Sequence, residues 1–371
     1  MADRAPSGAW PSRYELLDGL RGIAALTVVL HHLGVIEAGH FAVLVFFVIS
    51  GYCITASAES SRRNGLGFGR FMLRRVTRIY PPYLLAILFY SASRAVKALT
   101  GGHNDLNRPL LDWVQNLTLT QWVSSIWHPL TWPSDNPHLF VSAFWSLNYE
   151  EQFYLIVAIG LALAAAVRVP LIASSLLLAG AGLAWNWIIP GSRVYGMFIE
   201  YWAHFALGSC LYFVLCVYTG RRSRLLFLGA VLLLAVACLT RILPWTTTAL
   251  QDLRSMVELS FLSAVTLGLF WLRPLSKRIS DSALWRPVAW LGAISYSLYL
   301  IHQFNLTLAT AIAGHMLPGS SPHFLLIAAT IAVHIALAAG FWYLCERPFL
   351  NSHRAVVPPP LRAAAEAPRV A

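Results

Sequence analysis

Charged residues are scarce in this chain of 371 residues. Asp, Glu, Lys and Arg together make up 12% of it, whereas hydrophobic residues make up 57%. A soluble domain contains about 25% charged residues, so this composition excludes a sizeable soluble domain and predicts an integral protein of the lipid bilayer. Nucleic acid is disfavoured as a partner, because the basic residues fall in short stretches between apolar runs.

Cysteines are also few, and they lack the spacing of a metal site. Five are present, an odd number, and most of them lie inside apolar runs. We therefore expect free, inert thiols. The sequence has no zinc signature, no Gly-rich phosphate loop and no Gly-x-Ser-x-Gly elbow, so we predict neither a metal nor a permanently bound cofactor.

Long apolar runs, in contrast, are abundant. Ten are long enough to span a bilayer, which predicts an all-α, polytopic membrane bundle of about ten transmembrane helices over residues 1–350. The Pro/Ala-rich segment 351–371 is predicted to be a disordered cytoplasmic tail. The predicted spans are 20–38, 41–57, 79–97, 141–165, 171–189, 196–218, 225–243, 254–272, 288–314 and 323–345.

The placement of the basic residues predicts the orientation of these spans. Alternate connections carry most of the arginines, among them Arg62, Arg221 and Arg278, whereas the intervening connections carry few. The positive-inside rule therefore places both termini in the cytoplasm. The longest outer connection, 98–140, is rich in Trp, and an interfacial aromatic belt or an acceptor-binding platform would explain it equally well.

The first apolar run carries two ionisable residues on one helical face. Arg21 and His32 are eleven positions apart, which on an α-helix is about 1100°, or three turns plus about 20°. The rise between them is about 16 Å, so an arginine at a membrane surface would put the imidazole near the bilayer midplane. Each alone has a structural explanation, but together they indicate a functional site. His31 is rotated by about 100° from this face, so we choose His32.

An arginine-rich segment precedes the third apolar run. Arg70, Arg74 and Arg78 follow one another at intervals of four and share a helical face, with Arg75 beside that row. The Pro-Pro pair at 81–82 is expected to disturb the helix just after them. Contact with anionic lipid and a site for a phosphorylated cytosolic donor explain the cluster equally well, because arginine forks suit phosphate.

Two adjacent carboxylates, Glu150 and Glu151, open the fourth apolar run, near the outer face in the predicted topology. They could be solvated acids at a helix N-terminus, where negative charge is favourable. Aromatic neighbours such as Trp145 instead suggest partial burial, which requires an imidazole, an arginine or a sugar hydroxyl as partner. Both interpretations stay open.

A polar stripe marks the run 288–314. Ser295, Tyr299 and His302 are spaced i, i+4 and i+7 on an otherwise apolar helix. Interhelical hydrogen bonding is the simpler explanation of this stripe, and contact with a substrate is the alternative.

These segments, in this order, resemble the acyltransferase-3 family of membrane O-acyltransferases. The resemblance spans nearly the whole chain and rests on residues 17–22 with His32, then 46–52, 75–81, 145–154, 294–302 and 346–348. It implies a multi-helix enzyme of the bacterial inner membrane. Such enzymes move an acyl group, usually acetyl, from cytoplasmic acyl-CoA as co-substrate to a hydroxyl of a carbohydrate or glycolipid acceptor.

Residue by residue, the family's arginine and histidine, which have ten residues between them, correspond to Arg21 and His32. Its paired arginines correspond to Arg75 and Arg78, and its Trp-Ser-Leu-x-Val-Glu segment corresponds to 145–150. Two positions depart from the family pattern. Tyr149 stands where the family usually has Val, and Cys53 stands where it usually has Leu.

The resemblance and the spacing together give each residue a predicted role. The predicted catalytic residues are His32, Arg21 and Glu150; the donor-binding residues are Arg74, Arg75 and Arg78; the substrate-binding residues are Trp145, Tyr299 and His302. We expect His32 to act as a general base or through an acyl-imidazole, and the sequence leaves both open. The rival class is a transporter or flippase of a polar lipid or saccharide, whose translocation path the same charges would line. We find no inverted repeat typical of such folds.

Overall fold

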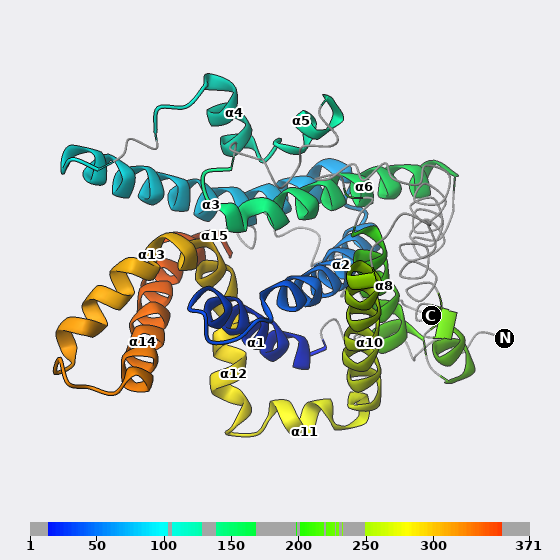
Figure 1. Cartoon of the computed structure of the whole chain (residues 1–371). Helices are drawn as coiled ribbons and strands as arrows, with labels where there is room; N and C mark the ends of the chain where they lie inside the picture. The colour runs from blue at the N-terminus through cyan, green and yellow to red at the C-terminus, as the bar shows by residue number, and fades with distance from the viewer. Residues whose placement is uncertain are drawn as a thin grey trace, which may run out of the picture.

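The computed structural model describes residues 14–102, 106–127, 139–167, 201–218 and 249–350, with 198, 220–226, 228–229 and 232 between them. Every element assigned in these residues is helical, which confirms the all-α class (Figure 1). The predicted span 171–189, most of the span 225–243 and the predicted tail 351–371 lie outside the described residues. The count of about ten transmembrane helices and the orientation of the termini stay predictions.

The bundle is built around α1 (Leu16–His32) and α2 (Gly39–Arg63). α2 packs on α8 (Trp202–Tyr212), which continues into a π-helical turn, Phe213–Val217. A Cβ atom on Gly51 would lie 2.1 Å from the Phe205 carbonyl oxygen, and one on Gly208 would lie 1.9 Å from the Val48 carbonyl oxygen. Glycine at both positions therefore lets the two backbones touch, as small residues do in membrane bundles.

A similar backbone contact fixes α1 against α12 (Trp285–Ala293). A Cβ atom on Gly292 would lie 1.8 Å from the Asp18 carbonyl oxygen, and one on Gly22 would lie 2.6 Å from the Gly292 nitrogen. Because Gly22 must face α12, the side chain of Arg21 points about 100° away from that contact, toward the interior of the bundle. The glycines thus set the rotation of α1.

α3 (Phe68–Leu99) and α6 (Trp145–Val167) run side by side across the molecule, and α4 (Leu110–Thr118) and α5 (Trp122–Trp127) lie beyond them (Figure 1). α3 is continuous through the prolines at 81–82, so the predicted disturbance there is wrong. An interior proline costs about 3 kcal/mol in an isolated helix, but packing against neighbouring helices compensates in a bundle. The helix that contains Tyr296 contacts α3 here, because the Tyr296 hydroxyl donates to the Ile79 carbonyl at 3.0 Å.

The C-terminal half begins with α10 (Ala249–Trp271), a short 3-10 turn (Arg273–Leu275) and α11 (Ser276–Ser280). After α12 come α13 (Ser295–Met316) and α14 (His323–Phe341), which pack together as a hairpin and end in a π-helical turn (Trp342–Glu346) and α15 (Arg347–Leu350). The single span predicted over 288–314 is therefore wrong, because the chain divides at Ile294 into α12 and α13. Ser295 donates to the Gly292 carbonyl at 2.8 Å across this junction, which hydropathy alone does not reveal.

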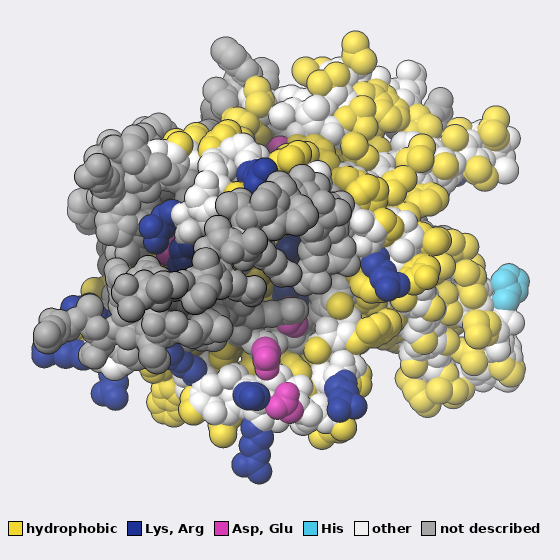
Figure 2. All heavy atoms as spheres, turned by 180° about the vertical axis from the view of Figure 1, so that it is seen from behind, with side chains coloured by type: hydrophobic (Ala, Val, Ile, Leu, Met, Phe, Trp, Pro, Cys, Tyr) yellow, Lys and Arg dark blue, Asp and Glu magenta, His cyan; other side chains and the backbone are white. Residues whose placement is uncertain are grey.

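Among the residues that the structure describes, two helices are long and apolar enough to cross a membrane, those over Gly39–Arg63 and His323–Leu350. Exposed apolar side chains cover the upper part and one side of the face in Figure 2, whereas many charged side chains gather along its lower edge. This separation of apolar and charged surface is what a bilayer requires.

Candidate functional site

A cavity of about 70 Å³ lies inside the bundle, between five helices. Its polar lining is Arg21 from α1, Ser50 and Cys53 from α2, Arg75 and Arg78 from α3, Ser146, Glu150 and Tyr154 from α6, and Ser295, Tyr296 and Tyr299 from α13. Five of the nine predicted functional residues therefore line one cavity: Arg21, Arg75, Arg78, Glu150 and Tyr299.

Glu150 is half-buried in this cavity and is held by two hydroxyl groups. Ser50 Oγ donates to its Oε1 atom at 3.0 Å, and the Tyr154 hydroxyl donates to the same atom. The predicted topology puts Glu150 at the outer face and the arginines at the inner end, and this separation is wrong. Arg75 and Arg78 lie two to three turns inside α3 rather than in a loop, so they reach the depth of Glu150.

Arg75 is the most buried arginine of the cavity, with a relative exposure of 8%. Its guanidinium lies over the rings of Phe71 and Tyr154, 5.7 Å from each centroid, and its Nε atom has no hydrogen-bond partner among the described residues. The face of α3 that lines the cavity carries Arg75 and Arg78 rather than the predicted row of Arg70, Arg74 and Arg78. Arg74 does not line it, so a donor-binding role for Arg74 stays a prediction.

A second carboxylate balances the arginines from outside the cavity wall. Glu346, in the π-helical turn after α14, accepts a hydrogen bond from Ser297 Oγ at 2.5 Å and is 4% exposed. It interacts electrostatically with Arg21 and Arg78. With three guanidiniums facing two carboxylates, the site carries an excess of positive charge and favours an anionic ligand.

His32 is not part of the cavity lining. It is the last residue of α1, which ends there rather than at 38 as predicted, and its side chain is exposed. Gly34, with a φ of 70°, turns the chain just after it. The predicted extension of this helix to residue 38 is therefore wrong, although Arg21 and His32 do share α1. The ring of His32 lies 4.9 Å, centroid to centroid, from that of His302.

Tyr299 connects the cavity with these histidines. Its hydroxyl lies 2.6 Å from Ser146 Oγ at the cavity wall and donates to the Ala143 carbonyl. Its ring lies 5.5 Å from that of His302, and its backbone carbonyl contacts His302 Nδ1 at 2.6 Å. Side chains in contact therefore run from the cavity through Tyr299 and His302 to His32.

Trp145 lies away from this path. It packs in an aromatic cluster with Phe47, Tyr149 and Tyr201, at centroid distances between 5.7 and 6.0 Å. Tyr149, which departs from the family pattern, belongs to the same cluster, so its ring fills the bundle interior. Glu151 points elsewhere, toward the hydroxyl of Tyr80, which donates to it.

Sequence reasoning missed several polar groups of the site. It assigned no role to Ser50, Ser146 or Tyr154, and it did not pair Ser297 with Glu346. The residues at 46–52 and 346–348 did carry the family resemblance, and that was the available signal. Within the described residues, no group of three His, Cys, Asp or Glu side chains could hold a metal ion.

Comparison with known proteins identifies the family. A family described as an acyltransferase domain, the acyltransferase-3 family, matches residues 14–343. BcsY of Komagataeibacter xylinus, provisionally named a membrane-bound transacylase, is 27% identical over 355 residues, which cover 92% of this chain and 84% of BcsY. No solved structure matches the chain.

Two further relatives are named for the modification of peptidoglycan. YrhL of Bacillus subtilis, provisionally named a peptidoglycan O-acetyltransferase, is 28% identical over 90% of this chain and 54% of its own length. Peptidoglycan O-acetyltransferase OatA of Listeria monocytogenes is 28% identical over 85% of this chain and 53% of its own. The chain thus spans about half the length of these two proteins. The family match and the all-helical, largely apolar fold confirm the resemblance: the chain belongs to the acyltransferase-3 family and is a membrane acyltransferase.

Proposed function

We propose that the protein transfers an acetyl group from cytoplasmic acetyl-CoA to a hydroxyl of a carbohydrate or glycolipid acceptor in the bacterial inner membrane. One observation carries this proposal: an arginine-lined cavity and the His32–His302 pair are connected through Tyr299. The names of YrhL and OatA support both an acetyl group and a carbohydrate acceptor.

The cavity suits the phosphate part of such a donor. Its volume is about 70 Å³, and three arginines contribute to its lining. We therefore assign it a phosphate group rather than a whole coenzyme. Arg75 offers an Nε donor that has no protein partner among the described residues, and Arg78 lies one helical turn further along the same wall. Guanidinium groups bind phosphate through paired, charge-assisted hydrogen bonds.

The thioester would then lie near His32. Arg21 and His32 are eleven positions apart on α1, a rise of about 16 Å that the extended arm of the donor would cover. As general base, His32 takes the proton of the acceptor hydroxyl while the hydroxyl oxygen attacks the thioester carbonyl. The carbon–sulfur bond then breaks, and coenzyme A leaves as a thiolate. Attack by His32 itself, to give an acyl-imidazole, remains the second mechanism.

Glu150 fits a supporting role in this scheme. It links α2 to α6 through Ser50 and receives a hydrogen bond from Tyr154, whose ring lies beneath the Arg75 guanidinium. We propose that Glu150 fixes the position of Tyr154 and thereby of Arg75. Its effect on catalysis would then be indirect.

Acetyl transfer by purified protein tests the proposal. Protein in lipid nanodiscs is incubated with radiolabelled acetyl-CoA and a membrane glycan fraction, and label in the glycan and free coenzyme A are both measured. The expected result is labelled glycan with release of an equal amount of coenzyme A. Absence of both with every acceptor tried would contradict the enzyme and favour a transporter.

A further inference from the structure

A second imidazole is buried directly behind His32. His302 lies on α13 with a relative exposure of 1%, and it does not line the cavity. His334 on α14 is close enough to it for an electrostatic interaction, and His32 on α1 contacts its ring. Because it is buried there, His302 does not contact a substrate in the cavity. Any effect of His302 on the reaction must therefore pass through a neighbouring side chain.

The hydrogen bond of His302 indicates which of its nitrogens carries a proton. Nδ1 lies 2.6 Å from the Tyr299 carbonyl oxygen, and a carbonyl oxygen only accepts. Nδ1–H is therefore the donor, and in a neutral ring Nε2 then presents a lone pair. Nε2 is buried and has no hydrogen-bond partner in the described part of the chain. A buried acceptor without a partner is unfavourable unless it receives a donor at some stage of the reaction.

His32 is the neighbour that can supply this donor. Its ring centroid lies 4.9 Å from that of His302, with the ring planes inclined at 40°. Because His32 is the exposed last residue of α1, its ring has room to turn and present an N–H group to Nε2. Hydrogen bonds between catalytic groups are often long in the free enzyme and shorten once the substrate is bound.

We propose that His302 is a positioning residue for His32. Its Nε2 accepts a hydrogen bond from one nitrogen of His32, and this leaves the other nitrogen of His32 unprotonated and directed at the acceptor hydroxyl. The proposal rests on the proposed function, in which His32 is the general base. His302 plays the part that a carboxylate plays in the Ser-His-Asp arrangement, but as a neutral group.

The proton balance of the step follows from this arrangement. The hydroxyl proton of the acceptor moves to the unprotonated nitrogen of His32 as the new carbon–oxygen bond forms. When the carbon–sulfur bond breaks, that proton passes to the coenzyme A thiolate. His302 keeps its own proton on Nδ1 throughout and gains none.

Two substitutions separate this role from a structural one. His302→Asn puts an amide nitrogen near the place of Nδ1, so it keeps the donor to Tyr299 but leaves nothing at Nε2. His302→Gln puts its amide oxygen near the place of Nε2, where it can accept from His32, but loses the Nδ1 donor. A positioning role requires His302→Gln to be the more active variant, whereas a structural role through Tyr299 requires the reverse.

We expect His302→Asn to lower kcat about 100-fold, with the KM for acetyl-CoA changed less than 2-fold, and His302→Gln to stay within about 10-fold of wild type. His315→Asn, an exposed position on the same helix, is the matched control and should behave as wild type. Thermal unfolding verifies that each variant folds. A His302→Asn enzyme at least as active as His302→Gln overturns the proposal.

A measurement on wild-type protein keeps the test independent of turnover and of the variants' folding. In ¹⁵N spectra of histidine-labelled protein, we expect one buried histidine with a protonated Nδ1 and a bare Nε2, whose Nε2 signal shifts in His32→Ala. A buried histidine next to His32 that carries its proton on Nε2 overturns the proposal. Failure of the proposed function is a different result, namely no acetyl transfer by wild-type protein.

Discussion

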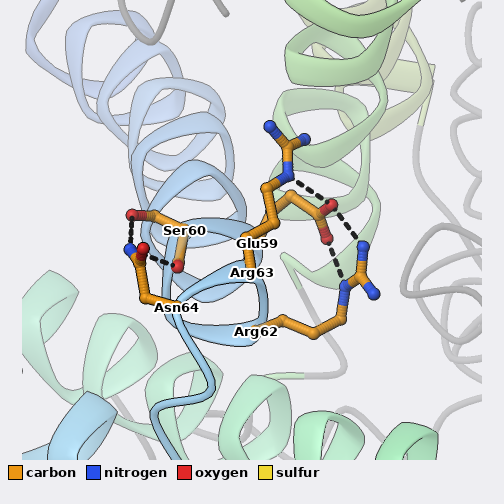
Figure 3. A network of polar contacts seen from close by, with 5 residues as sticks. All are labelled: Glu59, Ser60, Arg62, Arg63 and Asn64. Carbon is orange, nitrogen blue, oxygen red and sulfur yellow. Dashed lines mark hydrogen bonds and ion pairs between the residues drawn. The ribbon is translucent and has the colours of Figure 1, made fainter. Parts of the chain in front are cut away.

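Arginine and glutamate meet in two regions of this molecule, with opposite results. At the C-terminal end of α2, Glu59 lies between Arg62 and Arg63 and accepts hydrogen bonds from both (Figure 3). The distances are 2.9 and 2.7 Å to Arg62 Nε and Nη2 and 3.0 Å to Arg63 Nε. In the cavity, Glu150 accepts from two hydroxyl groups instead, and the Nε of Arg75 has no protein partner in the described structure.

The difference separates a structural use of charge from a functional one. At the end of α2 the Glu59 carboxylate is 6% exposed and is paired with two arginines of the same helix. The network therefore stabilises that end of the helix and leaves few charged groups for a ligand. In the cavity, aromatic rings and hydroxyl groups surround the charges and leave a guanidinium donor available. A buried guanidinium with an unused donor is costly unless a ligand completes it.

The largest effect should come from His32→Ala. Loss of a general base lowers kcat by about 10²–10⁴-fold, and a lost acyl-imidazole would abolish turnover. Because His32 is exposed at the end of α1, the variant should fold and unfold at the same temperature as wild type. The measurement is acetyl transfer in nanodiscs together with thermal unfolding. Turnover at the wild-type rate would remove His32 from the mechanism.

Arg75→Ala and Arg62→Ala form the next, matched pair. Removal of a charge-assisted contact to phosphate should raise the KM for acetyl-CoA about 10- to 100-fold in Arg75→Ala. Arg62 is bound to Glu59 and outside the cavity, so Arg62→Ala should leave this KM unchanged. Initial rates at varied acetyl-CoA check both, and an equal KM in the two variants would contradict the assignment of the cavity to the donor.

The smallest effects should come from the two carboxylates, and they should differ in kind. Glu150→Gln keeps an acceptor for Ser50 and Tyr154 but removes the charge, so we expect activity to fall about 10-fold with little change in stability.

Glu59→Gln weakens two partly exposed ion pairs, which should lower the free energy of unfolding by about 1 kcal/mol and leave activity intact. Activity and thermal unfolding are measured on both. Loss of activity in Glu59→Gln and none in Glu150→Gln would reverse the comparison.

Much of this could be read from the sequence, because helical periodicity and hydropathy are local properties. They gave the all-α class, the shared helix of Arg21 and His32, and the stripe of Ser295, Tyr299 and His302. The break at Ile294 was not readable, because the apolar run continues across it and the close contact of Gly292 with the backbone of α1 is a tertiary feature. The nearness of Glu150 to the arginines was missed for a similar reason. A predicted topology assigns residues only to the inner or the outer side of the membrane. Which residues of two helices lie at the same depth depends on how those helices pack together.

The partnership between Ser297 and Glu346 illustrates the same limit. The two residues are 49 positions apart and come from α13 and the turn that follows α14. Each appears in the sequence as an isolated polar residue beside an apolar run. Only the packing of α13 on α14 brings them together, so their pairing could not be predicted from spacing.

The close approach of Gly22 and Gly292 has a consequence for donor selectivity. A helix whose backbone rests on a neighbouring backbone can neither slide nor turn without a clash, so His32 at the end of α1 keeps a constant position relative to the cavity. We hypothesise that the enzyme thereby selects donors of a particular length. Acetyl thioesters that lack the nucleotide, such as S-acetyl-N-acetylcysteamine, should then be poor substrates even at high concentration. Equal maximal rates with this short thioester and with acetyl-CoA would show that length is not measured.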